Sequence, residues 1–315
     1  MLKCDLKIMK FLLTILLISS TFTAVNAQNN YVKLYEGAIP NSKPSENLEK
    51  TSINDWKIQF TTDISVPTIA RFDPPEKIKN GTTVIVCPGG GYMGTADEHE
   101  GVQVAKKLNE MGVTVFVLRY RMPSSRTMVD SSIGALQDAQ QAIRLVKQNA
   151  IKWKLNPNRI GIMGFSAGGH LASTAGTHFQ AKADPSVNDT FSVRPDFMML
   201  IYPVISFKNE LTHMGSRDKL VGQNPSFEKI YAFSNEEQVT SETPPTFLVH
   251  AGDDDAVNVG NSVEFYKSCI KNKVPVEMHL YPKGGHGFGM DNKTTSDKWM
   301  DRLGNWLDSQ GFLKK

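Results

Sequence analysis

The sequence has few cysteines and no cysteine motif. Of its 315 residues only three are cysteine, and no two of them form a C-x-x-C pair, so a zinc or redox motif is not indicated. Cys4 lies in the N-terminal segment. Cys87 ends an apolar run and Cys269 lies in a helix-like stretch, where two buried free thiols are more common than a disulfide.

The chain also lacks a long hydrophobic run, an excess of one charge and internal repeats. Its net charge is +3 with no basic cluster, which argues against nucleic acid or an anionic membrane as a partner. The composition, with 40% hydrophobic residues, is typical of a soluble globular protein, and the length fits one α/β domain.

Residues 1–27 have the parts of a secretory signal peptide. Three lysines flank the short apolar run 11–18, and small residues precede a cleavage point after Ala27. A membrane anchor is the alternative, but the apolar run is far shorter than the roughly 20 residues that span a bilayer. We therefore expect a secreted or periplasmic protein formed by residues 28–315.

Short apolar runs and helical patterns alternate along this chain. The runs at 82–86, 113–118, 159–163, 197–202, 246–251 and 276–281 alternate with helical patterns at 101–111, 133–149, 171–177, 261–272 and 296–310. This alternation predicts an α/β fold with a mostly parallel central sheet covered by helices on both faces. One excursion, 206–244, is long and polar, and we expect it to form either a surface segment with one or two short helices or a cap over the site.

The motif Gly164-Phe165-Ser166-Ala167-Gly168 identifies a candidate nucleophile. G-x-S-x-G is weak evidence alone, but here it follows a buried strand and opens a helix. That strand–turn–helix context is typical of a nucleophile elbow, which holds the serine hydroxyl at the carboxyl end of the sheet. Ser166 is therefore the predicted nucleophile.

His286 is the predicted general base, because a serine hydroxyl needs one. It lies in the glycine-rich loop 284–289 directly after the last strand, so it reaches the sheet edge that carries Ser166. The other histidines have simpler explanations: His170 is expected to pack or hydrogen-bond, His250 and His279 lie inside strands, and His99, His178 and His213 are expected in loops or on the surface.

An acid must hold the base, and three candidates follow one strand. Asp253, Asp254 and Asp255 all lie near the correct edge of the sheet. Three adjacent carboxylates repel one another, so we expect only one to be buried against the imidazole. The residues alone do not separate the three, but the order serine, aspartate, histidine is that of α/β-hydrolases.

Three consecutive glycines follow the strand 82–86, in Pro88-Gly89-Gly90-Gly91-Tyr92. An ordinary strand-to-loop turn is one explanation. Bare backbone N–H groups at this position can also combine with the amide of Ala167 in an oxyanion hole, where losing one donor costs about 3–4 kcal/mol.

Five segments together resemble the acetylxylan esterase-like α/β-hydrolases, an esterase/lipase group often labelled xylanase B. These segments are 88–92, 116–123, 164–172, 244–250 and 284–289. The resemblance implies an α/β-hydrolase fold and oxyanion amides from Gly90, Gly91 and Ala167. In that group the acid follows a Gly-x-x-Asp spacing, which Gly252 and Asp255 match, so the resemblance selects Asp255.

The resemblance implies a serine esterase that removes acetyl groups from carbohydrate fragments, with Ser166, Asp255 and His286 as the catalytic set. No metal or organic cofactor is expected, and the partner is a small-molecule or oligosaccharide ester. The alternatives are a general short-chain carboxylesterase, a peptidase of the same fold and a non-catalytic carbohydrate-binding relative. A peptidase would need a large gating domain, for which 288 residues leave no room, and the intact catalytic set argues against a non-catalytic relative.

Overall fold

A computed structural model of the protein describes residues 31–314 except 56 and 189. The predicted signal peptide at 1–27 and Cys4 lie outside the described residues. Within the described part, no helix has the length and apolar character needed to cross a membrane. Cys87 and Cys269 are both buried free thiols, as predicted.

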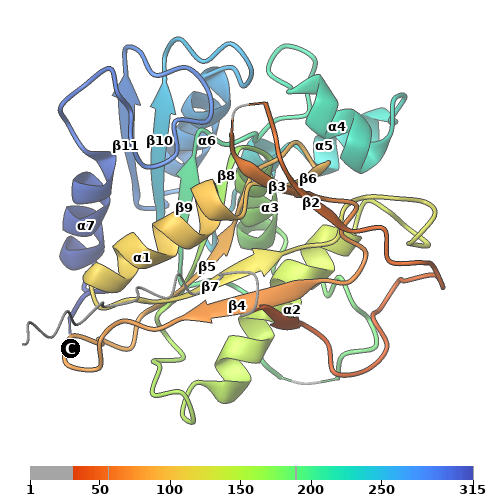
Figure 1. Cartoon of the computed structure of the whole chain (residues 1–315). Helices are drawn as coiled ribbons and strands as arrows, with labels where there is room; N and C mark the ends of the chain where they lie inside the picture. The colour runs from red at the N-terminus through yellow and green to blue at the C-terminus, as the bar shows by residue number, and fades with distance from the viewer. Residues whose placement is uncertain (1–30, 56, 189, 315) are drawn as a thin grey trace, which may run out of the picture.

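The core of the molecule is a sheet of eight strands in the order β1-β4-β7-β5-β8-β9-β10-β11 (Figure 1). Its strands are β1 (Tyr31–Lys33), β4 (Thr68–Phe72), β5 (Thr83–Cys87), β7 (Thr114–Arg119), β8 (Ile160–Phe165), β9 (Phe197–Ile201), β10 (Thr246–Ala251) and β11 (Val276–Tyr281). From β7 to β11 all pairs are parallel, whereas β4 pairs antiparallel with both β1 and β7.

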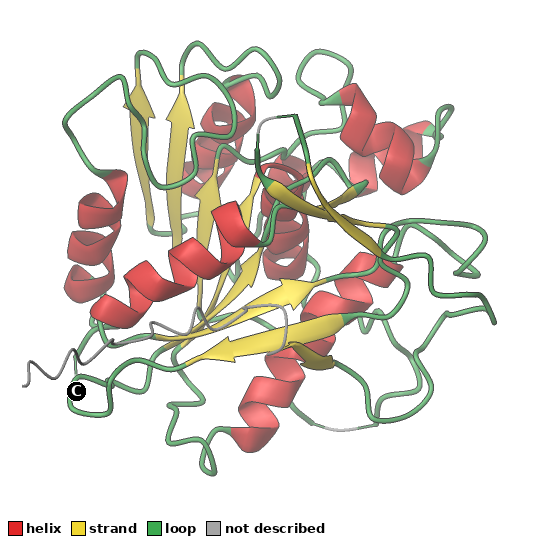
Figure 2. Ribbon diagram, viewed as in Figure 1, coloured by secondary structure: helices red, strands yellow, loops and turns green. Residues whose placement is uncertain are grey.

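Helices cover both faces of this sheet (Figure 2). The helices are α1 (Gln103–Glu110), α2 (Gly134–Asn149), α3 (Ser166–Thr177), α6 (Gly260–Lys271) and α7 (Trp299–Ser309). Residues of α1 and α7 join one apolar cluster, and residues of α2, α3 and α6 join the other. The arrangement confirms the predicted α/β-hydrolase fold.

Strand β5 shows why the buried runs were readable in the sequence. Val84 and Val86 enter the cluster on the α1 side, whereas Ile85 and Cys87 enter the cluster on the α2 side. A strand buried on both faces needs apolar residues at every position. The continuous runs from β5 to β10 follow from this two-sided burial.

The N-terminal strands were not predicted. A small second sheet contains β2 (Lys50–Ile53), β3 (Gln59–Thr62) and β6 (Gly94–Thr95) in antiparallel order. Every residue of β2 is exposed, so it carries no run of buried residues. Strand β6 follows the glycine loop directly, so the small sheet places β3 beside the predicted site.

The excursion 206–244 holds α4 (Met214–Val221), α5 (Phe227–Ala232) and the short 3-10 turn Asn235–Glu237, which agrees with the expected one or two short helices. Part of it closes the domain's own core. Phe207 and Leu220 are buried there, and Phe233 stacks near Phe207 at a ring distance of 6.3 Å. The exposed aromatic residues are instead Phe227 and Tyr231 on α5.

This division predicts effects of very different size for two phenylalanines. Phe233→Ala is expected to lower the free energy of unfolding by about 3 kcal/mol, because it empties space in the core. Phe227, which is 74% exposed, should change it by less than about 0.5 kcal/mol when replaced by alanine. Urea unfolding of the two variants checks this, and equal losses would contradict the packing described.

Candidate active site

Ser166 lies at the junction of β8 and α3, as its motif predicted. Its backbone has φ of +52°, a left-handed conformation that few non-glycine residues adopt. The close approach of α3 to the end of β5 requires glycine at 168, since a Cβ there would lie 2.1 Å from the carbonyl oxygen of Cys87. The elbow thus holds the serine at the carboxyl edge of the sheet, where its residue is 8% exposed.

His286 reaches Ser166 from the loop after β11. The Nε2 atom of His286 lies 2.8 Å from Oγ of Ser166, a distance at which the hydroxyl donates a hydrogen bond to a neutral imidazole. The His286 side chain is 23% exposed. The structure therefore brings the predicted nucleophile and the predicted base together.

Asp254, not Asp255, holds the imidazole. Nδ1 of His286 donates to Oδ2 of Asp254 at 2.7 Å, and the Asp254 side chain is fully buried. Asp255 is exposed. The prediction of Asp255 as the acid is wrong in this structure, although the expectation that only one of the three carboxylates would be buried against the imidazole is confirmed.

The turn after β10 explains the choice of carboxylate. Oδ1 of Asp254 accepts the backbone N–H groups of Ala256 and Val257 at 3.0 and 2.8 Å, which folds the side chain inward and leaves Asp255 at the tip of the turn. Asp253 contributes differently, because its Oδ1 accepts the N–H of Gly285 at 2.8 Å and holds the loop that carries His286.

The environment of Asp254 keeps it ionised. Burial acts to raise its pKa, but hydrogen bonds from His250 and His286 outweigh burial and hold the pKa well below the usual range of an aspartate. Nε2 of His250 lies 3.2 Å from Oδ2 of Asp254. Sequence reasoning gave His250 no role beyond its strand, yet it lies four residues before the acid and contacts it.

The glycine loop lies directly beside Ser166. A Cβ placed on Gly89 would be 2.9 Å from Cβ of Ser166, and one on Gly90 would be 2.2 Å from the carbonyl oxygen of Gly94. With φ of +145°, Gly90 also has a backbone that other residues rarely adopt. Ala167 follows Ser166 at the start of α3. The amides of Gly90, Gly91 and Ala167 remain the predicted oxyanion donors.

A buried carboxylate that the sequence did not reveal holds the glycine loop. Glu100 lies in the π-helical turn Glu98–Val102, and its Oε2 accepts the N–H of Gly89 at 2.7 Å. Its Oε1 accepts the hydroxyl proton of Tyr202 at 2.8 Å, and the Tyr202 oxygen accepts the N–H of Gly289 at 2.9 Å. The loop beside the nucleophile and the loop of the base are therefore joined through Glu100 and Tyr202.

Tyr202 also packs against the base. Its ring centroid lies 5.1 Å from that of His286, with the planes at 64°. Burial, followed by the nearby Glu100 carboxylate, raises the pKa of Tyr202 well above its ordinary value, so the hydroxyl keeps its proton. Neither Glu100 nor Tyr202 stands in a recognisable motif: Glu100 follows three other polar residues, Asp97, Glu98 and His99, and only Tyr202 is a polar group at the end of an apolar run.

His170 packs and hydrogen-bonds within the core beside the site, as predicted. Nδ1 accepts the hydroxyl proton of Tyr92 at 2.8 Å, Nε2 donates to the carbonyl oxygen of Phe233 at 2.8 Å, and the ring stacks on Phe207 at 4.3 Å. Burial lowers the pKa of His170 to about 4. The imidazole is therefore neutral near pH 7 and acts as a structural group.

A pH-dependent loss of stability is expected from His170. An unfolded histidine titrates near pH 6.5, so between about pH 6.5 and 4 the unfolded state binds more protons than the folded state. The stabilisation present above about pH 6.5 is lost as the pH falls toward 4, by roughly 2–3 kcal/mol. Urea unfolding at pH 7, 5.5 and 4 should show a shallower decline for His170→Gln, and parallel declines would contradict the assignment.

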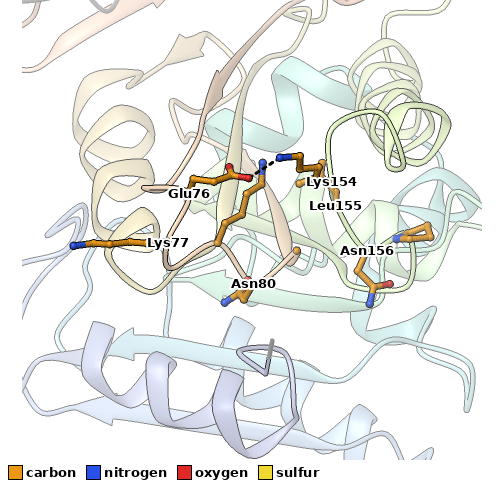
Figure 3. Close-up of a pocket in the computed structure, with 9 residues that line it drawn as sticks. Glu76, Lys77, Asn80, Lys154, Leu155 and Asn156 are labelled. Carbon is orange, nitrogen blue, oxygen red and sulfur yellow. Dashed lines mark hydrogen bonds and ion pairs between the residues drawn. The ribbon is translucent and has the colours of Figure 1, made fainter.

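Two cavities lie at different distances from the catalytic loops along the chain. One, of about 570 Å³, is lined by Glu76, Lys154, Asn156 and neighbouring residues (Figure 3). Its lining residues precede β5 and β8, so it lies at the edge of the sheet opposite Ser166. The other, of about 380 Å³, includes Tyr92 and Met93, which directly follow the glycine loop. The second cavity therefore lies next to the glycine loop, although no catalytic residue lines it.

The histidine, cysteine, aspartate and glutamate side chains of residues 31–314, apart from the two undescribed positions, form no candidate metal site. Among the residues that the structure describes, no three histidine, cysteine, aspartate or glutamate side chains are grouped closely enough to hold a metal ion.

Comparisons with known proteins identify a family and several similar esterases and hydrolases. The family model described as BD-FAE matches residues 72–269. An acetylxylan esterase of Xylanibacter ruminicola is 35% identical over 73% of the chain and 46% of its own length. An endo-1,4-beta-xylanase B of Butyrivibrio fibrisolvens is 31% identical over 81% of the chain and 40% of its own length. The chain thus spans less than half the length of these two relatives.

A solved structure is similar over almost its full length. The acetyl ester-xyloside bifunctional hydrolase from Caldicellulosiruptor lactoaceticus is 36% identical, with a TM-score of 0.76 over 90% of this chain and 96% of that one. A sugar hydrolase from Lactococcus lactis is 29% identical, with a TM-score of 0.64 over 84% of this chain and 100% of that one.

Proposed function

We propose that the chain, which belongs to the BD-FAE family of α/β-hydrolases, is a serine esterase acting on O-acetylated carbohydrate. The observation that carries the proposal is the continuous hydrogen-bonded chain from Ser166 through His286 to Asp254. The names of the relatives, acetylxylan esterase and acetyl ester-xyloside hydrolase, support acetylated xylan or xylo-oligosaccharide as the substrate class.

The proposed reaction begins with attack by the serine. Ser166 Oγ adds to the ester carbonyl carbon while its proton passes to Nε2 of His286, and Asp254 stabilises the resulting imidazolium. The carbonyl oxygen takes up the negative charge and is held by the amides of Gly90, Gly91 and Ala167. The intermediate collapses, the ester C–O bond breaks, and His286 returns the proton to the departing sugar oxygen.

Hydrolysis of the acyl-enzyme completes the cycle. A water molecule gives a proton to His286 and adds its oxygen to the acetyl carbonyl carbon. Collapse of this second intermediate breaks the bond to Ser166 Oγ, which recovers the proton from His286 and releases acetic acid. These steps need no metal or organic cofactor.

The test is hydrolysis by the purified protein. Acetate release should be measured from acetylated xylan, acetylated xylo-oligosaccharides and p-nitrophenyl esters of acetate, butyrate and octanoate. We expect activity on acetylated sugar and on p-nitrophenyl acetate, with lower kcat/KM for longer acyl groups. Equal rates for all p-nitrophenyl esters and none for acetylated sugar would favour a general carboxylesterase, and no hydrolysis of any ester would overturn the proposal.

We also propose that the protein is exported. The sequence of residues 1–27 supports this, with cleavage after Ala27 and a secreted or periplasmic product. N-terminal sequencing of the protein isolated from its native host should begin at Gln28, and a chain that retains residues 1–27 in the cytoplasm would contradict the assignment.

A further inference from the structure

The first part of the excursion, residues 206–213, crosses the edge of the sheet that carries Ser166. The buried Asn261 of α6 fixes its course: Oδ1 accepts the N–H groups of Ile205 and Ser206, both at 2.9 Å, and Nδ2 donates to the carbonyl oxygen of Leu211 at 2.8 Å. Helix α6 follows the turn that holds Asp254. The segment therefore starts on the acid's side of the site.

The same segment ends at the glycine loop. Cε1 of His213 lies 4.0 Å from the position that a Cβ on Gly91 would occupy. Burial, and then the charge of His286, lower the pKa of His213 below the ordinary value of a histidine, while the charge of Asp254 acts to raise it. Both catalytic groups therefore act electrostatically on His213. His213, expected from the sequence to be a surface or loop residue, thus lies at the wall of the active site.

Hydrogen bonds fix the orientation of the His213 ring. His213 caps the N-terminus of α4, because its Nδ1 accepts the backbone N–H of Ser216 at 3.3 Å. The same Nδ1 lies 2.8 Å from the hydroxyl oxygen of Ser216. A backbone N–H can only donate, so Nδ1 has no proton and the neutral ring carries its proton on Nε2. Among the described residues, no group accepts a hydrogen bond from Nε2 of His213.

We propose that the Nε2–H of His213 binds the sugar part of the substrate, by donating a hydrogen bond to a hydroxyl or ring oxygen near the scissile ester. This inference rests on the proposed esterase function and adds a specificity residue to it. Capping of α4 uses only Nδ1, so the Nε2–H has no structural partner among the described residues. A neutral ring with its proton on Nε2 is a donor at that atom and cannot act there as a second general base.

His213→Asn tests the proposal. Asparagine is among the best residues for capping a helix N-terminus, so its side chain can still accept the Ser216 N–H while the more distant Nε2–H is lost. We expect kcat/KM for an acetylated xylo-oligosaccharide to fall by about 10- to 100-fold, mainly through KM, as for a lost hydrogen bond to substrate. For p-nitrophenyl acetate, whose alcohol has no sugar oxygen, kcat/KM should stay within about twofold.

Two further variants serve as controls. Met214→Ala changes the exposed neighbouring residue and should leave both substrates unaffected. His213→Ser supplies a neutral capping acceptor that is too short to reach the position of Nε2, and it replaces His213→Asn if that variant does not fold, as judged by its thermal unfolding.

The outcomes separate this inference from the proposed function. An equal fall for both substrates would mean that His213 acts on the oxyanion or on the site geometry and would overturn the inference, as would no change for either. A wild-type protein that hydrolyses neither substrate would instead overturn the proposed function.

Discussion

Replacing Asp254 by asparagine is expected to lower kcat by about 10⁴-fold. Asparagine keeps the shape of the side chain, but it removes the charge that orients His286 and stabilises the imidazolium. Because the pKa of Asp254 is held well below the usual range, the wild-type carboxylate is ionised throughout the neutral range. Steady-state hydrolysis of p-nitrophenyl acetate at pH 7 measures the loss.

Asp255→Asn is the matched control for that experiment. It makes the same chemical change one residue away, at an exposed position that does not contact His286. Its kcat should stay within about threefold of the wild type, since surface changes away from the site have small effects. A larger loss for Asp255→Asn than for Asp254→Asn would restore the acid predicted from the family spacing.

Replacing Ser166 is expected to have the largest effect on activity. Ser166→Ala removes the nucleophile, and kcat should fall by about 10⁶-fold, as observed when the members of such a catalytic set act as a unit. Activity of the variant near the wild-type level would exclude Ser166 as the nucleophile. Single-turnover measurement with p-nitrophenyl acetate should also show no acyl-enzyme.

The backbone at Ser166 adds a prediction about stability. Alanine retains the cost of a positive φ, whereas glycine adopts φ of +52° without that cost. Ser166→Gly should therefore be more stable than Ser166→Ala by about 1 kcal/mol, although both are inactive. Urea unfolding compares the two, and a less stable glycine variant would show that the elbow is not strained.

The parallel part of the fold could be predicted because its strands are buried on both faces. The runs that became β5, β7, β8, β9 and β10 are apolar at nearly every position. The strands before them could not be read in this way, because β2 is exposed at every residue. The positions of these N-terminal strands depend on pairing with β3 and β7, and the local sequence carries no pattern that indicates such pairing.

The catalytic residues also divide into those that a local pattern indicates and those that depend on the folded structure. Ser166 and His286 stand in glycine-rich turns whose chemistry is visible locally, so both were predicted. Choosing among Asp253, Asp254 and Asp255 required knowing how the turn folds, since two backbone N–H groups decide which carboxylate faces inward. Family spacing pointed to the neighbouring residue.

The residues that support the catalytic set, Glu100, Tyr202 and His213, could not be predicted from their local sequence. Glu100 and Tyr202 are 102 positions apart, and neither stands in a motif that indicates their contact. His213 has an ordinary sequence context, and only the path of the excursion brings it to Gly91. Such contacts arise from the tertiary arrangement, which a single sequence does not display.

The link through Glu100 and Tyr202 has a consequence for how the enzyme refolds. Its hydrogen bonds close chain loops of 102 and 87 residues, and contacts of such long sequence separation are slow to form compared with helices and neighbouring turns. Far-ultraviolet circular dichroism should therefore recover before ester hydrolysis after dilution from urea. The rate at which ester hydrolysis returns would then measure how fast the C-terminal segment around Gly289 docks against Tyr202, the contact that joins the two catalytic loops.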